Sequence, residues 1–263
     1  MRFYIDGLPA EEKKQTHTDR HERRQKALLK ANAAVSKLEW RFANRKRIRK
    51  HYITDANKNL QQAFHWSLDD RKSFVAYMAK KDYDIVLCPT EADVLIAVEC
   101  RPQDAIVSCD SDLLFYRTVS IVWRPVGSYK ARRFVPYEKS AVLDALSLSS
   151  TQLTALAILS GNDYFGNIPY LAIHTNLEVI KTLHGDERSI IRQYLSHRQV
   201  KRRTDKEGGK WSVESYSGAI KVFVDLKQSV ASEPASPPLA AKDNITTAED
   251  DTAITGNLFP SDN

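Results

Sequence analysis

The stretch that decides the fold is IVLCPTEAD (residues 85–93), an apolar run of strand length that leads directly into acidic residues. AIVSCDSD (residues 105–112) repeats the pattern, and residues 91–100 between the two runs have a helical pattern. A third apolar run, VSIVW, follows at residues 119–123. Buried strands that alternate with helices are typical of a parallel sheet covered by helices. The sequence therefore predicts an α/β fold.

Carboxylates follow the predicted strands, including the short N-terminal run at residues 3–5. They are Asp6, Glu91, Asp93, Asp110 and Asp112, and Asp163 follows a helix that stops at Gly161. If the strands are parallel neighbours, their carboxyl ends meet at one edge of the sheet. Clustered like charges raise each other's pKa unless cations neutralise them, and hard oxygen ligands select Mg²⁺ or Mn²⁺. We therefore expect a site for two divalent ions, which suits displacement at phosphorus.

Each carboxylate also has a simpler interpretation when it is taken alone. Thr90 and Asp93 have the spacing of a helix capping box, and Asp6-Gly7 is an ordinary turn sequence. Asp163 fits a turn after a helix stop. Only the joint pattern favours a metal site over these local roles.

The chain carries 39 Lys and Arg against 33 Asp and Glu, and the excess is concentrated near the N-terminus. Residues 11–50 contain fourteen basic and five acidic residues without Gly or Pro, which predicts a long helix or helical pair. This segment ends in Arg45-Lys46-Arg47-Ile48-Arg49-Lys50. We interpret it as an anion-binding surface, with a solvated helix face or a nuclear import signal as alternatives.

Several classes of protein and ligand are disfavoured. No apolar run reaches the roughly 20 residues of a membrane helix, and neither GxxxxGK[ST] nor GxGxxG is present to cradle a nucleotide. Cys88, Cys100 and Cys109 lie in apolar stretches without metal-ligand spacing, which predicts reduced thiols in an intracellular protein.

Four sequence blocks resemble the flap endonuclease/XPG family of structure-specific nucleases, in the PIN-like superfamily. The blocks, in the family's order, are Asp6-Gly7-Leu8-Pro9 with Lys13 and Arg20, Pro89-Thr90-Glu91-Ala92-Asp93, Ser108-Cys109-Asp110-Ser111-Asp112-Leu113-Leu114, and Leu159-Ser160-Gly161-Asn162-Asp163-Tyr164 with Asn167-Ile168-Pro169. The resemblance implies a parallel sheet flanked by helices, a basic helical arch and a helix–two-turn–helix module.

The resemblance also implies roles for individual residues. Asp6, Glu91, Asp93, Asp110, Asp112 and Asp163 correspond to the divalent-metal shell. Lys13 and Arg20 correspond to catalytic cations at the scissile phosphate. The basic residues of the arch, namely Arg23, Arg24, Arg45, Lys46, Arg47, Arg49 and Lys50, would contact the backbone of nucleic acid.

Two departures from the family pattern predict a truncated or degenerate member. The family's chains begin with a central strand that carries a further metal-binding Asp, whereas Met1 lies five residues before Asp6 here. The family's Gly-x-Gly hairpin is replaced by Pro169-Tyr170-Leu171-Ala172, whose Cβ atoms hinder close approach to a duplex.

We expect a PIN-like core at residues 1–148 that includes the arch at about 10–68, and a degenerate helix–two-turn–helix at 149–185. Residues 186–226 match no motif, and residues 227–263 are expected to form a disordered acidic tail. Ser149 or Ser150 should cap one helix of the module, and Thr175 or Asn176 a second helix at 177–183.

The function expected from these features is metal-dependent hydrolysis of branched or single-stranded DNA ends by a nuclear repair or replication enzyme. The alternatives are a catalytically inactive scaffold that binds nucleic acid or protein, as in post-transcriptional regulators that resemble this family, and an RNA-cutting PIN enzyme.

Overall fold

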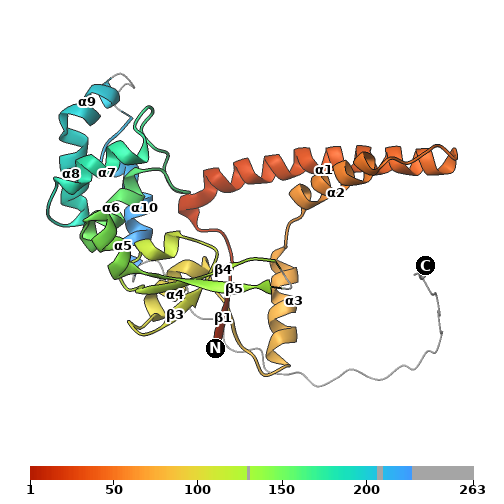
Figure 1. Cartoon of the computed structure of the whole chain (residues 1–263), viewed down its shortest axis with the longest axis horizontal. Coiled ribbons are helices and arrows are strands. Elements are labelled where there is room, and N and C mark those ends of the chain that lie inside the picture. The colour runs from red at the N-terminus through yellow and green to blue at the C-terminus, as the bar shows by residue number, and fades with distance from the viewer. Residues whose placement is uncertain (129–130, 206–209, 227–263) are drawn as a thin grey trace. The chain divides into compact units, whose positions relative to one another are not determined.

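The computed structural model describes residues 1–128, 131–205 and 210–226 (Figure 1). The predicted tail at 227–263 lies outside these residues. The strands are β1 (Arg2–Ile5), β2 (Asp84–Leu87), β3 (Ala105–Val107), β4 (Ile121–Val126) and β5 (Arg133–Glu138). The α-helices are α1 (Lys14–Ala43), α2 (Lys50–Ala63), α3 (Leu68–Ala79), α4 (Ala92–Glu99), α5 (Lys139–Leu146), α6 (Ser150–Leu159), α7 (Ile173–Lys181), α8 (Glu187–Ser196), α9 (Arg198–Thr204) and α10 (Ser217–Phe223). Short 3-10 helices are η1 (Glu11–Lys13), η2 (Asp112–Phe115) and η5 (Glu214–Tyr216).

The predicted strands are present, but they form two small sheets. β1 pairs in parallel with β2, and β3 pairs in parallel with β4. β5 was not predicted, and it adds to β4 in antiparallel register, with Ile121 opposite Glu138. The expectation that residues 3–5, 85–88 and 105–109 are neighbours in one parallel sheet is therefore wrong, because β2 and β3 do not pair.

Gly7 keeps the N-terminal segment against the β2 strand beyond the end of the sheet. The Gly7 N–H donates to the Thr90 carbonyl at 2.6 Å, and the Leu8 N–H donates to the Pro89 carbonyl at 3.1 Å. A Cβ on Gly7 would lie only 1.8 Å from the Cys88 carbonyl oxygen. Asp6-Gly7 is thus an extension of the strand pairing, not the free turn of the alternative interpretation.

The long basic helix is confirmed as α1, which lies beside α2 in an antiparallel hairpin (Figure 1). The helices approach through the buried alanines Ala27 and Ala31 of α1 and Ala56 of α2. α1 ends where Arg45 adopts a left-handed backbone with φ 49°, and the Lys46 N–H donates back to the Arg41 carbonyl at 2.8 Å. This closure is a Schellman motif with Arg in the position that Gly usually occupies.

The hydrophobic core lies under α6, where residues 152–159 are all buried. Ser149 caps α6 as predicted. Its side-chain hydroxyl accepts from the Gln152 N–H, and the side-chain oxygen of Gln152 accepts from the Ser149 N–H. Gly161 follows the helix with φ 91°, the conformation that ends a helix at low steric cost.

α7 begins at Ile173, so the prediction that Thr175 or Asn176 caps this helix is wrong. Asn176 is completely buried and serves the core instead. Its amide donates to the Ser160 hydroxyl, and its carbonyl oxygen accepts from the Tyr194 hydroxyl at 2.6 Å. The Asn176 side chain therefore hydrogen-bonds to buried side chains of the core and not to the backbone at the start of α7.

The unassigned residues 186–226 are part of the same core. Tyr194 of α8, Val200 of α9, and Ile220 and Phe223 of α10 are buried in it. The buried carboxylate of Glu187 accepts from the Nε of Arg117 at 2.6 Å, which links α8 to the segment after η2. These contacts extend the helical body well past the predicted module boundary at residue 185.

No single helix of the described residues is long and apolar enough to cross a membrane. α5 and α6 together reach the required length and composition, but they meet at 80°.

Gly7→Ala should destabilise the protein by about 3 kcal/mol, the upper end of the usual range for overpacking. The added methyl would collide with backbone carbonyls of residues 88 and 89, which cannot move without breaking the β1–β2 register. Chemical denaturation measures this change. Gly166→Ala is the matched control, because a Cβ there meets nothing within 4 Å, and its effect should stay within about 0.5 kcal/mol. Equal effects of the two variants would contradict the close approach at Gly7.

Candidate active site

The acidic residues are positioned by the ends of β1, β2 and β3 and by the first turn of α4. Asp6 follows β1, and its Oδ1 accepts from the Ala92 N–H at 2.8 Å. Asp6 therefore stabilises the N-terminus of α4, while Glu91 is the N-cap residue and makes no side-chain cap bond. The capping-box interpretation of Thr90 and Asp93 is thus wrong.

Asp93 lies among like charges. Burial, together with the charges of Asp110 and Asp6, raises the pKa of Asp93 to about 7. Burial and the charges of Asp110 and Asp163 likewise raise the pKa of Asp112. Asp110 is held by local hydrogen bonds, because its Oδ1 accepts from the Asp112 N–H at 2.9 Å and its own N–H donates to the Ser108 hydroxyl. The strand ends therefore gather carboxylates although the two sheets are separate.

Lys13 supplies positive charge at the edge of this acidic group. Its Nζ lies 2.8 Å from Oε2 of Glu91 and 3.5 Å from Oδ2 of Asp163. Burial alone would lower the pKa of Lys13, but Glu91, Asp163 and Asp93 together raise it. The Lys13 side chain is only 17% exposed, so these interactions are weakly screened by solvent.

Arg20 binds the other side of Asp163. Its Nη2 donates to both carboxylate oxygens of Asp163 at 2.8 Å. One turn earlier on α1, the Thr16 hydroxyl donates to the Asp163 backbone carbonyl at 2.6 Å. Lys13 belongs to η1 and precedes α1, yet both predicted catalytic cations contact the carboxylate of Asp163.

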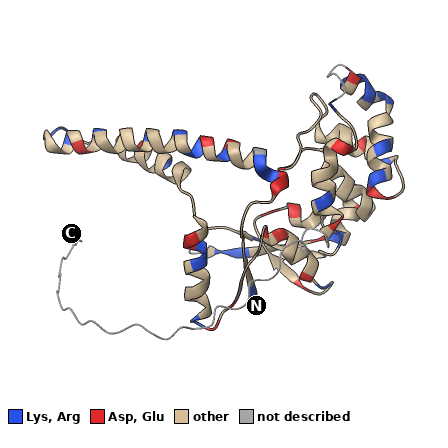
Figure 2. Cartoon of the chain, turned by 180° about the vertical axis from the view of Figure 1, so that it is seen from behind, with Lys and Arg blue, Asp and Glu red and all other residues tan. Residues whose placement is uncertain are grey.

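The remaining basic candidates occupy two places. Arg23 and Arg24 lie on α1 directly beyond Arg20, whereas the residues from Arg45 to Lys50 are exposed where α1 turns into α2. Figure 2 shows Lys and Arg recurring along α1. At 1.5 Å per helical residue, Arg20 and Arg45 are roughly 35–40 Å apart along the helix. The second group therefore cannot share a ligand atom with the acidic site.

Two contributors were missed. Tyr164 lies in a sequence block that predicts no role for it, yet its hydroxyl donates to Oε2 of Glu91 at 2.9 Å while Lys13 lies over its ring. Arg71 of α3 donates to the carbonyls of Asp6 and Gly7, each at 2.8 Å. No sequence signal marks Arg71, because its partners are backbone atoms 64 and 65 residues away.

The six predicted metal ligands do not form a ready coordination sphere. In residues 1–128, 131–205 and 210–226, no group of three or more His, Cys, Asp or Glu side chains is arranged to hold a metal ion. Glu91 and Asp163 are instead engaged by Lys13 and Arg20. The chemistry of the other donors, Asp6, Asp93, Asp110 and Asp112, nevertheless fits a hard divalent cation. Their assignment as ligands stays a prediction.

Comparisons with known proteins match the same part of the chain. Residues 74–163 match the family model of the XPG I-region. Flap endonuclease 1 of Cryptosporidium parvum (strain Iowa II) is 25% identical over 199 residues, which cover 70% of this chain and 38% of that protein. The chain thus spans well under half the length of this curated relative.

Solved structures are similar in fold. The catalytic core of Rad2 in complex with DNA substrate matches with a TM-score of 0.50 and 16% identity, over 85% of this chain and 63% of that chain. Flap endonuclease-1 from Methanococcus jannaschii matches with a TM-score of 0.40 and 19% identity, over 70% and 66% of the two chains. Residues 74–163 therefore match the XPG I-region, and over a larger part of its length the chain is similar in sequence to a flap endonuclease and in fold to the catalytic core of Rad2.

Proposed function

We propose that this chain is a metal-dependent, structure-specific nuclease that hydrolyses phosphodiester bonds in branched or single-stranded DNA ends. The observation that carries the proposal is the meeting of strand-end carboxylates with Lys13 and Arg20 at the root of a basic helix. A site of this kind combines groups for a cation with groups for an anionic substrate.

Arg20 is suited to hold a phosphate while it remains at the site. It uses Nη2 for both contacts with Asp163, and its side chain is 48% exposed. Its Nη1 and Nε can therefore face a phosphate oxygen. Lys13 is more enclosed and can exchange its weaker contact with Asp163 at 3.5 Å for a phosphate oxygen, because its contact with Glu91 at 2.8 Å retains it. Both cations would stabilise the charge that develops during hydrolysis.

Asp6, Asp93, Asp110 and Asp112 are the residues that would hold Mg²⁺ or Mn²⁺, with two ions as the expectation from the sequence. Bound there, the metal would neutralise the clustered carboxylates, polarise the phosphodiester and lower the pKa of a water molecule. The half-buried Asp93, whose pKa is raised to about 7, is the member whose negative charge most needs such a partner.

The basic hairpin of α1 and α2 offers a path for the nucleic-acid backbone away from the site. Arg23 and Arg24 continue the line from Arg20, and the group from Arg45 to Lys50 lies at the far end. Phosphate contacts of this type hold nucleic acid without reading its sequence. DNA is favoured as substrate because the catalytic core of Rad2, to which the chain is similar in fold, was solved in complex with DNA substrate. A nuclear location remains a prediction from the basic group.

A second candidate function is a nuclease-derived scaffold that binds nucleic acid or protein without cutting. One observation favours it: Lys13 and Arg20 already neutralise Glu91 and Asp163, and the described residues contain no arranged metal site. Metal dependence separates the two functions, because a scaffold should bind nucleic acid equally well in chelator.

Asp110→Asn should abolish Mn²⁺-dependent cleavage of a labelled 5′-flap DNA by the 263-residue chain, with a loss of about 100-fold or more. The amide retains an oxygen for the Asp112 N–H, so the local backbone should hold while one negative charge is lost. Asp104→Asn is the matched control: Asp104 also accepts a backbone N–H, at 2.9 Å, but it lies before β3 while Asp110 lies after it. Single-stranded RNA of the same length tests the RNA alternative.

Each outcome of this assay decides between the functions. Cleavage that survives in Asp110→Asn would show that the activity does not belong to this site. A folded chain that binds the flap in chelator and never cuts would reject the nuclease and support the scaffold.

Tyr164→Phe should lower the unfolding free energy by about 1–2 kcal/mol, because the partly buried Glu91 loses one donor. The ring would keep its contacts with Phe223 and Lys13. If Tyr164 positions Glu91 and thereby Lys13, kcat should also fall while KM changes little. Tyr83→Phe is the control, since Tyr83 is 49% exposed and its ring contacts Phe3. Unchanged stability and unchanged kcat in Tyr164→Phe would contradict this role.

A further inference from the structure

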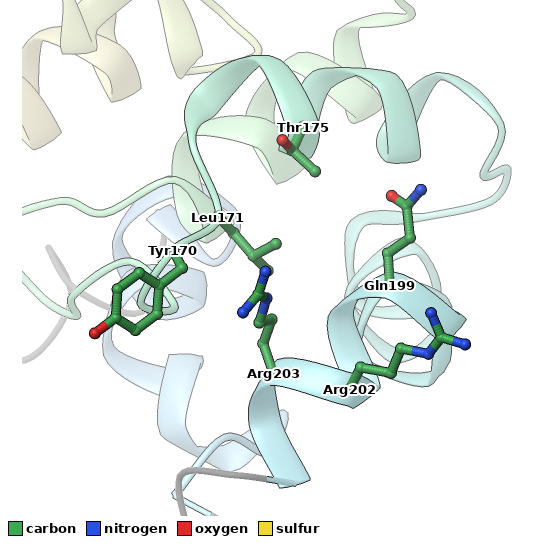
Figure 3. Close-up of a pocket in the computed structure, with 6 residues that line it drawn as sticks. All are labelled: Tyr170, Leu171, Thr175, Gln199, Arg202 and Arg203. Carbon is green, nitrogen blue, oxygen red and sulfur yellow. The ribbon is translucent and has the colours of Figure 1, made fainter.

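A pocket of about 530 Å³ lies in the helical body and contains none of the predicted site residues. Three segments line it: Tyr170 and Leu171 come from the hairpin before α7, Thr175 from the first turn of α7, and Gln199, Arg202 and Arg203 from α9 (Figure 3). Its volume lies within the range of natural ligand sites. The wall combines positive charge, hydrogen-bonding groups and an aromatic ring.

The hairpin holds Tyr170 outward in an unfavourable backbone conformation. Ile168 and Leu171 are buried on either side of it, and the Leu171 N–H closes the turn on the Ile168 carbonyl at 3.2 Å. Tyr170 has φ 63° and is 85% exposed. A bulky residue in the left-handed region costs about 1–2 kcal/mol, and an exposed ring contributes little burial in return. Such an outlier points to a role outside the fold itself.

α9 supplies the charge of this surface. Its basic residues are Arg198, Lys201, Arg202 and Arg203, and its seven residues include no acidic one. Val200 and Thr204 are buried and anchor the helix, so the arginines are left exposed. Arg203 lies over the Tyr170 ring with its guanidinium carbon 5.8 Å from the centroid. Among the salt bridges of the described residues, neither Arg202 nor Arg203 has a carboxylate partner.

This combination selects one class of ligand. Two guanidinium groups that have no carboxylate partner among the described residues favour a phosphate, which they can bind through paired N–H donors. An exposed tyrosine ring beside an arginine is a platform on which a nucleobase stacks. Paired bases in a duplex interior present no free face to such a ring, whereas an unpaired base does. The Thr175 hydroxyl and the Gln199 amide add hydrogen-bonding groups to the same wall (Figure 3).

We propose that the pocket between Tyr170 and α9 binds a nucleotide of single-stranded nucleic acid, with its base on the Tyr170 ring and its phosphate against Arg202 and Arg203. This goes beyond the proposed nuclease function, because it requires neither the acidic site nor a metal. It also assigns a role to a basic helix that the sequence motifs leave unexplained.

The test measures binding of fluorescein-labelled dT12 to the 263-residue chain by anisotropy in EDTA, where no cleavage occurs. Arg203→Gln and Arg202→Gln should each weaken binding several-fold, and Tyr170→Leu by about tenfold, as expected for the loss of one stacked base. Arg198→Gln is the matched control, because it removes the same charge from the same helix outside the pocket. Thermal unfolding of each variant verifies its fold.

The pattern of losses decides the proposal. Equal losses of dT12 affinity in Arg198→Gln and Arg203→Gln, with no loss in Tyr170→Leu, would overturn the proposal. They would show that binding depends only on the overall positive charge of α9. Binding of a 12-base-pair duplex that is equally sensitive to Tyr170→Leu would also overturn it. Competition by free dTMP as strong as that by dT12 would replace it with a mononucleotide site. Photo-crosslinking of a 5-bromouracil oligonucleotide to Tyr170, mapped by mass spectrometry, would support it without relying on a variant.

Discussion

Repulsion among carboxylates at the strand ends is the constraint on which the rest of the site depends. Asp6, Asp93 and Asp110 come from different segments, yet they lie close enough that the charges of Asp110 and Asp6 add to the effect of burial and raise the pKa of Asp93. An arrangement of this kind costs folding free energy unless positive charge is placed beside it. Lys13 of η1 and Arg20 in the second turn of α1 supply this positive charge. The acidic group and the beginning of the basic helix are therefore one electrostatic unit.

The same contacts attach the N-terminal end of α1 to the rest of the protein. Thr16 and Arg20 bond to Asp163, and Glu12 pairs with Lys221 of α10. Beyond these contacts, α1 extends with little burial, since its buried residues are Ala27 and Ala31 among those described. A phosphate backbone bound along α1 would thus contact the same helix whose N-terminal end holds Lys13 and Arg20 at the acidic group. Under the proposed function, this coupling would place phosphate binding and the charge balance of the acidic group on one structural element.

Much of this arrangement could be predicted from short-range signals. The strand runs, the acidic residues after them, the uninterrupted basic segment, the Ser149 cap and the Gly161 stop are all local patterns, and the structure contains them. What could not be predicted depends on long-range partners. The strands form two separate sheets, although each strand is recognisable in the sequence. Asn176 hydrogen-bonds within the core and does not cap a helix, and Arg71 donates to backbone carbonyls far away in the sequence. The pairing of Lys13 with Glu91 likewise requires the fold, because 78 residues separate them.

The most direct measurement of the central claim is a crystal structure of the chain soaked with Mn²⁺, with anomalous diffraction used to locate the ion. The account predicts anomalous density among Asp6, Asp93, Asp110 and Asp112, with Lys13 still beside Glu91. No density at this group in crystals soaked at millimolar Mn²⁺, or density only at unrelated surface carboxylates, would contradict the claim that the strand-end carboxylates form the metal centre of a nuclease.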